Sequence, residues 1–207
     1  RQTTGFVESL LRLVRLNWAV PDFSTLCRRQ KTLNVSLPFR GGTGPLNLLI
    51  DSTGIKSEGE GEWKARKHGG SKRRIWRKIH IGIDEETLEV RAVEVTTSNV
   101  GDAPMLPELL EQIPPDQAIG SITADGAYDT RKCHDAIATR NAHAVIPPRK
   151  NRKLQYDYDK TIYKQRNVIE RMFCRLKDWR RVATRYDRCP ETFFSAIMLA
   201  ATVLFWL

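Results

Sequence analysis

Two stretches of alternating apolar and polar residues, 76–83 and 88–96, constrain most strongly what this chain can fold into. Successive side chains of a strand point to opposite faces of a sheet, so each stretch predicts a strand with one buried face. The polar residues 84–87 between them predict a tight turn, and the whole region therefore predicts a β-hairpin. On the second strand we expect one face to carry Leu88, Val90, Ala92 and Glu94, and the other to carry Val93 and Val95.

Short apolar runs predict three further strands, and two of these runs lead into an aspartate. Residues 45–51 lie between glycine-containing turns and end in Asp51, and residues 118–124 are followed by Asp125. We expect each aspartate to lie where its strand ends. A carboxylate at the rim of a sheet must be solvated, paired or ligated, because its charge is costly to bury. The third short strand is predicted at 142–146.

Helical patterns flank and separate these strands. Hydrophobic residues make up 41% of the 207 residues, which is enough for a packed core. Three strands followed by strands that alternate with helices predict an α/β fold, a mixed sheet of five strands flanked by helices. The apolar run 193–207 is shorter than the roughly 20 residues that span a bilayer, so a buried last helix is favoured over a truncated membrane span. The helices are expected at 103–112, 131–140, 162–180 and 191–206.

Residues 1–43 are predicted to form an N-terminal helical segment, separate from the α/β domain over 44–207. Apolar residues recur at helical spacing from Thr4 onward, and Pro21 followed by Asp22 can open a second short helix. Two helices joined by a tight turn fit a helix-turn-helix DNA-binding element or a structural helical hairpin, and the pattern does not separate the two. Because the chain begins without Met, we expect further residues upstream of it.

Positive charge is concentrated in two stretches. The net charge is +10; residues 63–80 hold eight Lys or Arg and no acid, and residues 147–181 hold twelve with four acids. Clustered Lys and Arg neutralise phosphates, so the pattern favours a nucleic-acid partner. Trp63 and Trp76 flank the first stretch and could stack on bases, although a core position is favoured for Trp76. The basic residues of this predicted DNA-binding arm are Lys64, Arg66, Lys67, Lys72, Arg73 and Arg74.

The predicted helix 162–180 brings one acid into a row of polar side chains. At about 100° per residue, Arg166, Glu170 and Lys177 fall within roughly 60° of Tyr163 on the helix surface. The apolar residues of this helix occupy an adjoining arc of about 140°. The polar row therefore lies at the edge of the buried face, where it can face a cleft rather than open solvent.

Asp51, Asp125 and Glu170 together suggest a metal site. Carboxylates are hard oxygen ligands that suit Mg²⁺ or Mn²⁺. Two such ions about 3.5–4 Å apart can activate an attacking oxygen and stabilise a leaving one in phosphodiester displacement. The four cysteines, by contrast, lack the spacing of a zinc site or a disulfide framework; they are Cys27, Cys133, Cys174 and Cys189.

At these residues the sequence resembles bacterial insertion-sequence DDE transposases with a ribonuclease H-like fold. The spacing Tyr163-x2-Arg166-x3-Glu170-x6-Lys177 is similar to the Tyr-Arg-Glu-Lys signature of that family. The segments around Asp51 and Asp125, and residues 76–80, also resemble the surroundings of the family's two aspartates. The resemblance covers about residues 44–181.

The resemblance implies a ribonuclease H-like catalytic domain over 44–207 in which Asp51, Asp125 and Glu170 bind two Mg²⁺ or Mn²⁺ ions. It implies cleavage of double-stranded DNA at transposon terminal inverted repeats, followed by strand transfer into target DNA. It also implies a homo-oligomer acting in the bacterial cytoplasm at the nucleoid, without a membrane. Tyr163, Arg166 and Lys177 are expected to contact DNA near the break.

Two alternatives keep the same fold. A ribonuclease or Holliday-type nuclease would use similar carboxylates, but the Tyr163, Arg166 and Lys177 set around Glu170 favours a transposase. A decayed transposase remnant, acting as a DNA-binding protein or repressor, would keep the basic surface without catalysis. The intact acids argue against that alternative.

Overall fold

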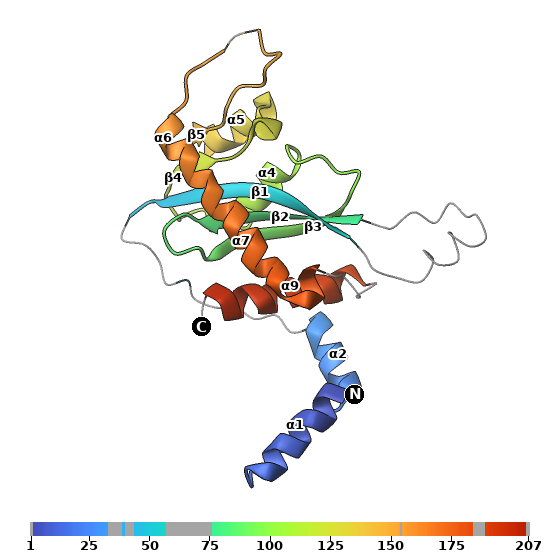
Figure 1. Ribbon diagram of the computed structural model, residues 1–207. Helices are drawn as coiled ribbons and strands as arrows, with labels where there is room; N and C mark the ends of the chain where they lie inside the picture. Colours follow the sequence, from blue (N-terminus) through green and yellow to red (C-terminus); the bar gives the residue numbers. More distant parts are fainter. Residues whose placement is uncertain are drawn as a thin grey trace, which may run out of the picture.

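Five strands form one mixed sheet at the centre of the molecule, in the order β3-β2-β1-β4-β5 (Figure 1). Strands β1, β2 and β3 are antiparallel neighbours, whereas β4 and β5 run parallel to β1. Their bounds are Leu46–Lys56, Trp76–Asp84, Val90–Thr97, Ile119–Thr123 and His143–Val145. The computed structural model describes residues 2–32, 39, 44–56, 76–153, 155–183 and 189–205.

Helices cover both faces of this sheet. Helices α4 and α5 lie against one face, and α7 and α9 lie across the other (Figure 1). The fold class predicted from the sequence, a ribonuclease H-like mixed five-stranded sheet flanked by helices, is therefore confirmed. The helices of this domain are α4 Met105–Glu111, η1 Gly126–Tyr128, α5 Arg131–Thr139, α6 Lys160–Tyr163, η2 Lys164–Arg166, α7 Asn167–Asp178, α8 Arg180–Ala183 and α9 Pro190–Phe205.

The central strand β1 divides the core into two hydrophobic clusters. Leu48 and Ile50 are fully buried on the α4 and α5 side, and Leu49 and Ile55 are buried on the α7 and α9 side. Because side chains alternate along a strand, Asp51 shares the face of Leu49 and Ile55. The strand thus directs its aspartate toward the side of the sheet that α7 covers.

The prediction that Asp51 ends its strand is wrong. Strand β1 continues to Lys56, because β2 pairs with it over the whole length from Leu48 to Lys56. The antiparallel neighbour supplies backbone partners that the local sequence Ser-Thr-Gly does not reveal.

The predicted faces of the second hairpin strand are only partly correct. Val90 packs with Val93 on the α7 side, whereas Ala92 lies on the opposite face. The register shifts between Gly82 and Ile83, so Ile83 pairs with Val90 while Gly82 pairs with Ala92. This irregularity inserts Arg91 as an extra residue and reverses the alternation, as a β-bulge does.

The predicted single helix over 162–180 is interrupted. Its first turn is α6, a 3₁₀ turn η2 follows, and the regular helix α7 begins at Asn167. Trp179 is extended, with ψ of 103°, and separates α7 from the short helix α8. The apolar face of α7 is buried as predicted, through Ile169, Met172, Phe173 and Leu176.

Two helices precede the sheet domain, α1 Gln2–Leu13 and α2 Phe23–Thr32. As predicted, the carboxylate of Asp22 caps the second helix by accepting hydrogen bonds from the backbone N–H groups of Ser24 and Thr25. The connection, residues 14–22, is longer than the three or four residues of a helix-turn-helix turn, so that alternative is not supported. Helix α1 extends away from the sheet domain (Figure 1) and leaves Phe6 63% exposed.

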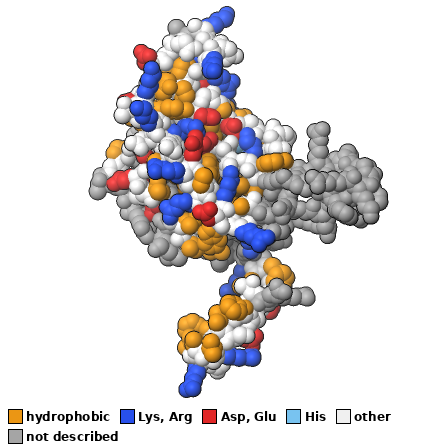
Figure 2. Space-filling view, in the orientation of Figure 1, with side chains coloured by type: hydrophobic (Ala, Val, Ile, Leu, Met, Phe, Trp, Pro, Cys, Tyr) orange, Lys and Arg blue, Asp and Glu red, His pale blue; other side chains and the backbone are white. Residues whose placement is uncertain are grey.

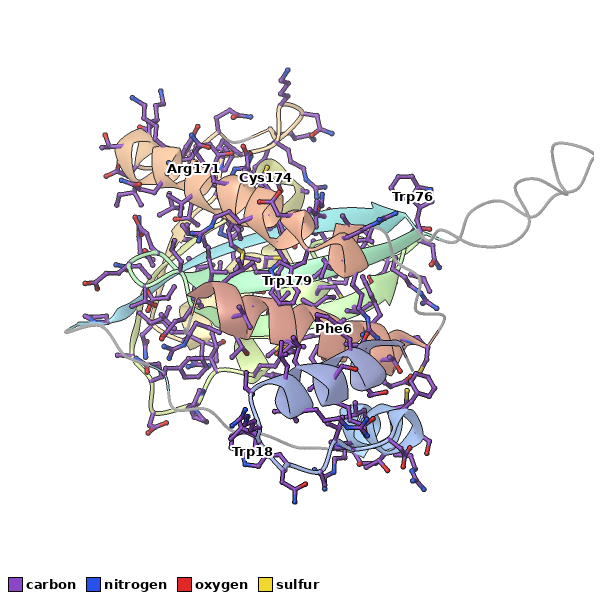
Figure 3. The ribbon with its side chains drawn as sticks, turned by 60° about the horizontal axis from the view of Figure 1, so that its bottom comes forward. Phe6, Trp18, Trp76, Arg171, Cys174 and Trp179 are labelled. Atoms are coloured by element: carbon purple, nitrogen blue, oxygen red, sulfur yellow. The ribbon has the colours of Figure 1, made fainter. Side chains whose placement is uncertain are left out.

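The core prediction for Trp76 is wrong, and that for the last helix is correct. Trp76 lies at the start of β2 and is 45% exposed (Figure 3), with its ring against Gly54. Helix α9 buries Phe193 and Ile197 completely. Within the described part of the chain, none of the helices combines the length and the apolar character needed to cross a membrane.

Candidate active site

The first two acids of the predicted site meet where β4 ends beside β1. Strand β4 pairs with β1 as far as the partners Leu49 and Thr123, whereas β1 itself runs on to Lys56. Asp51 and Asp125 each lie two residues beyond this last pair. The end of parallel pairing therefore brings both carboxylates to one place, although only Asp125 follows the end of its strand.

A short 3₁₀ turn fixes the backbone at Asp125. The Asp125 carboxylate accepts a hydrogen bond from the Ala127 backbone N–H at 2.9 Å and so caps η1. Gly126 follows, and a Cβ at this position would make ordinary van der Waals contact with the Pro147 carbonyl oxygen, at 3.4 Å. The second carboxylate oxygen of Asp125 is left for other interactions.

Helix α7 and the turn before it bring the third acid to Asp51. Arg166 donates from Nη1 to Asp51 Oδ2 at 2.9 Å and from Nη2 to Glu170 Oε1 at 2.6 Å. Its guanidinium thus joins a strand carboxylate to a helix carboxylate. The side chain of Glu170 is 54% exposed, and that of Asp51 is 15% exposed.

Lys177 and Tyr163 lie on the same side of the helical segment. Lys177 donates from Nζ to Thr53 Oγ1 at 2.7 Å, and Thr53 shares a β1 face with Asp51. The Arg166 guanidinium lies 5.9 Å from the centre of the Tyr163 ring, which makes an edge contact with Tyr158 at 5.3 Å. The predicted polar row therefore faces β1, with Tyr163 displaced onto α6 by the 3₁₀ turn.

The charges around Asp51 are unbalanced. Burial raises the pKa of the Asp51 carboxyl, and the neighbouring Asp125 and Glu170 carboxylates raise it further. The Ser52 backbone N–H and the Arg166 guanidinium act in the opposite direction without reversing the shift. Burial works to lower the pKa of Arg166, but Asp51, Tyr163 and Glu170 raise it overall. The Asp125 and Glu170 carboxylates thus repel the Asp51 carboxylate electrostatically, and a bound cation would relieve this repulsion.

Behind Asp51, a second polar cluster braces the opposite face of β1. Asp102 accepts hydrogen bonds from Ser52 Oγ at 2.6 Å and Lys78 Nζ at 2.7 Å. Burial acts to raise the Asp102 pKa, but these two donors lower it overall. The nearby His80 is fully buried, which lowers its pKa to about 4 and keeps the imidazole neutral. Asp102 could not be recognised from the sequence, because it precedes the predicted helix 103–112 and resembles an ordinary cap.

The donor chemistry fits a hard divalent cation, but the acids are not arranged around one. In the described ranges, no three His, Cys, Asp or Glu side chains form a group that could hold a metal ion as they stand. Asp51 and Glu170 bind different nitrogens of the Arg166 guanidinium, which spans the space between them. The position between these two acids already accommodates one positive charge.

The surface over α7 combines both signs of charge. Figure 2 shows acidic side chains in the middle of this face with Lys and Arg side chains around them. Arg171 and Cys174 lie on the outer side of α7 (Figure 3), away from the contacts with β1. The residues predicted for the basic arm, from Lys64 to Arg74, lie outside the described residues.

Comparison with known proteins places the chain among transposases. Residues 42–206 match the family model described as transposase DDE domain, and residues 1–60 match a second model with the same description. The chain is 31% identical over 131 residues to the protein of Brucella ovis assigned as transposase of insertion sequence element IS6501, with 63% of this chain and 97% of that protein covered. A second relative, assigned to element IS402 of Burkholderia cepacia, is 25% identical over 174 residues, which cover 79% of this chain and 80% of that protein.

Among solved structures, the catalytic core domain of BIV integrase aligns with a TM-score of 0.46 at 14% identity, covering 78% of this chain and 84% of that chain. The fold itself rests on the strand order and registers of the chain described above. The family rests on the match over residues 42–206. The chain belongs to the transposase DDE domain family.

Proposed function

We propose that this chain cleaves DNA at the ends of a mobile element and joins the freed ends to target DNA. Asp51, Asp125 and Glu170 hold two divalent ions, Mg²⁺ or Mn²⁺, in this reaction. The observation that carries the proposal is the proximity of three carboxylates: Arg166 joins Asp51 to Glu170, and the charges of Asp125 and Glu170 raise the pKa of Asp51.

The reaction consists of two displacements at phosphorus. In the first, a water oxygen attacks the scissile phosphodiester, the bond to the 3′ oxygen breaks, and a free 3′-hydroxyl is left on the element. In the second, this hydroxyl attacks a target phosphodiester and expels a target 3′-hydroxyl, so that one ester bond replaces another without a covalent protein intermediate. When bound, the ions lower the pKa of the attacking oxygen and stabilise the leaving one.

Arg166 has two successive roles in this proposal. In the free protein its guanidinium bridges Asp51 and Glu170 and offsets part of their negative charge. When cations occupy the acids, the guanidinium is released and can bind a DNA phosphate beside the break, for which its planar donor geometry is suited. Arg166 thereby holds the two carboxylates together until the cations and DNA arrive.

The remaining residues of the row bind DNA in the same proposal. Lys177 lies beside Thr53 on the same face as Asp51 and supplies a phosphate contact next to the acids. Tyr163 presents its hydroxyl or its ring near Arg166. The basic arm from Lys64 to Arg74 binds double-stranded DNA at the terminal inverted repeats. The active form is a homo-oligomer on paired ends, acting in the bacterial cytoplasm at the nucleoid.

A cleavage assay tests the proposal. The substrate is linear DNA carrying the inverted repeats that flank the gene, incubated with the full chain in Mg²⁺, Mn²⁺ or Ca²⁺. We expect nicking in Mg²⁺ and Mn²⁺ that leaves a 3′-hydroxyl at the element end, and its loss in Asp51→Asn and Glu170→Gln. Binding to the repeats without cleavage in either metal contradicts the proposal and favours a DNA-binding remnant. Cleavage that ignores the repeat sequence favours a general nuclease.

A further inference from the structure

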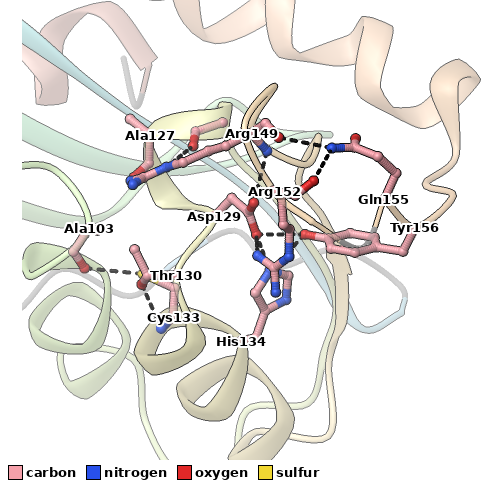
Figure 4. Close-up of polar contacts among 11 residues, drawn as sticks. Ala103, Ala127, Asp129, Thr130, Cys133, His134, Arg149, Arg152, Gln155 and Tyr156 are labelled. Carbon is pink, nitrogen blue, oxygen red and sulfur yellow. Dashed lines mark hydrogen bonds and ion pairs between the residues drawn. The ribbon is translucent and has the colours of Figure 1, made fainter.

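A buried hydrogen-bond cluster lies next to the turn that carries Asp125. Figure 4 shows Asp129 at its centre. The side chain of Asp129 is 1% exposed. This carboxylate accepts hydrogen bonds from the Arg149 backbone N–H at 2.9 Å, from Tyr156 Oη at 2.8 Å and from Arg152 Nη1. His134 Nε2 lies 3.1 Å from the same carboxylate. Buried carboxylates are stable when their oxygens are satisfied in this way.

Three of the four partners of Asp129 come from one segment of chain. Arg149, Arg152 and Tyr156 lie between β5 and α6; we call the described residues 147–153, 155 and 156 the hook. Gln155 closes the hook on itself by donating to the backbone carbonyls of Arg149 and Arg152 at 3.1 and 3.0 Å. Asp129 therefore binds a folded segment, not three independent side chains.

The hook also contacts the Asp125 turn directly. Arg149 donates from Nε to the Gly126 carbonyl at 3.0 Å and from Nη2 to the Ala127 carbonyl at 2.6 Å. The backbone N–H of Ala127 in turn donates to the Asp125 carboxylate. Asp129, the hook and the Asp125 carboxylate are thus linked through a few hydrogen bonds on one turn.

The His134 ring fits this cluster in one protonation pattern. Asp129 can only accept, and Tyr156 Oη donates to it, so His134 Nε2 must carry a hydrogen to lie 3.1 Å from Asp129 and 2.9 Å from Tyr156 Oη. The His134 and Tyr156 rings meet edge to face, with centres 5.6 Å apart. Helix α5, which carries His134, is thereby joined to the hook as well.

We infer that Asp129 is a positioning residue: together with Arg149 it holds the hook against the 125–129 turn and so fixes the Asp125 carboxylate for cation binding. The inference rests on the proposed function, because it assigns a cation to Asp125. It goes beyond that function in giving the hook a role. Partners that orient a metal ligand change metal affinity by about 10- to 100-fold when they are removed.

Three variants of the full chain test this inference: Arg149→Gln, Asp129→Asn and the control Arg131→Gln. Arg149 is exposed, so its substitution removes the contacts to the Gly126 and Ala127 carbonyls without opening the core. Arg131 is an equally basic, 94% exposed neighbour whose ion pair is with Asp135. Mn²⁺ binding is measured by electron paramagnetic resonance, and amide hydrogen exchange is followed at residues 126–129.

We expect Arg149→Gln to weaken Mn²⁺ binding by about 10-fold and to accelerate exchange in the turn, with the melting temperature almost unchanged. Asp129→Asn should weaken Mn²⁺ binding and accelerate exchange more strongly, and Arg131→Gln should do neither. Wild-type Mn²⁺ affinity and wild-type exchange in Arg149→Gln overturn the inference, whether or not Asp129→Asn folds. If the unaltered chain does not bind Mn²⁺, the proposed function fails, and exchange alone then decides whether Arg149 holds the turn.

Discussion

Two arginine–aspartate centres lie close together in this molecule and differ in almost every physical respect. At Asp51, one guanidinium serves two carboxylates, one of them 54% exposed, and a third acid acts on the first. At Asp129, one carboxylate is 1% exposed and receives donors from two arginines, a tyrosine and a histidine. The Asp51 centre has too many acids for its cations, and the Asp129 centre has its single acid fully satisfied.

The pKa shifts express the same contrast. Burial and two like charges raise the pKa of Asp51. At Asp129 burial acts in the same direction, but the hydrogen-bond donors prevail and lower the pKa far below its ordinary value. A centre whose acid is unfavourable as an anion can accept a further cation, whereas a saturated centre has no need of one. The Asp51 centre therefore suits cation binding, and the Asp129 centre suits a structural role.

The largest expected effect is on catalysis at the Asp51 centre. Asp51→Asn removes one ligand and should lower the cleavage rate by about 10³-fold or more, because bound metal contributes several kcal/mol to the transition state and each 1.36 kcal/mol is tenfold. Burial and two neighbouring carboxylates destabilise the Asp51 anion, so its replacement by a neutral side chain should not lower the thermal stability. The exposed Asp116→Asn serves as the control in the same cleavage assay. A rate within threefold of the unaltered chain would mean that Asp51 is not a ligand.

The corresponding change at the other centre should act on stability. Asp129→Asn replaces one acceptor oxygen by an NH₂ donor and leaves the Arg152 cation without a carboxylate, and breaking a buried ion pair costs about 3–5 kcal/mol. Since Arg152 is 35% exposed and can reach water, we expect the lower end of this range. Urea denaturation measures the loss. An unchanged free energy of unfolding would show that the Asp129 centre does not stabilise the fold, contrary to its assigned structural role.

Arg166 sharpens the comparison because it can be removed from a centre that is short of cations. Without this competitor, Arg166→Ala should bind Mn²⁺ about 2- to 5-fold more tightly, since partly exposed ion pairs contribute up to about 1 kcal/mol. The same variant should bind DNA less tightly. Arg171→Ala, on the outer side of the same helix, is the matched control for both titrations. Weaker Mn²⁺ binding in Arg166→Ala contradicts the proposed exchange of guanidinium for metal.

The two centres should change the stability of the protein in opposite directions as the pH falls. The lowered Asp129 pKa gives a stability contribution that is complete above about pH 4, the ordinary value for an aspartate, and is lost as the pH falls below it. The raised Asp51 pKa contributes stability at low pH that is lost as the pH rises through its folded value. Denaturation between pH 3 and pH 7 should therefore show a shallower acid loss in Asp129→Asn. An identical pH dependence in that variant and the unaltered chain would count against the assignment.

The smallest expected effect concerns Lys177, at the margin of the Asp51 centre. Its hydrogen bond to Thr53 is worth about 1 kcal/mol of stability. The logarithm of DNA affinity falls linearly with the logarithm of salt concentration. If Lys177 contacts a phosphate, it should make this slope steeper by about 1. Lys177→Ala should reduce that slope accordingly, measured by fluorescence anisotropy with repeat DNA. A slope equal to that of the unaltered chain would place the DNA elsewhere.

The sequence predicted the strands and helices around Asp51 better than the details of their pairing. Hydrophobic periodicity is a local property, so the sheet, its helices and the shared helix face of Arg166 and Glu170 followed from the pattern. The continuation of β1 to Lys56 and the bulge at Arg91 could not be predicted, because both depend on pairing with a neighbouring strand.

The Asp129 centre escaped the sequence analysis for a similar reason. Asp129 and Arg149 are twenty residues apart and meet only because the hook folds back onto the turn. Nothing in their local sequence distinguishes them from surface charges. The exposed position of Trp76 was also not predicted. Alternation of apolar and polar residues indicates which face of the sheet a side chain lies on, but not how deeply it is buried at the start of a strand.

The central claim is that Asp51, Asp125 and Glu170 form one cation site, and Mn²⁺ titration of the full chain tests it most directly. Electron paramagnetic resonance counts the bound ions in the unaltered chain and in Asp51→Asn, Asp125→Asn and Glu170→Gln. We expect two bound ions per chain and a weakened or lost ion in each variant, with Asp51→Asn the most severe. Mn²⁺ binding that is the same in all three variants as in the unaltered chain would contradict it.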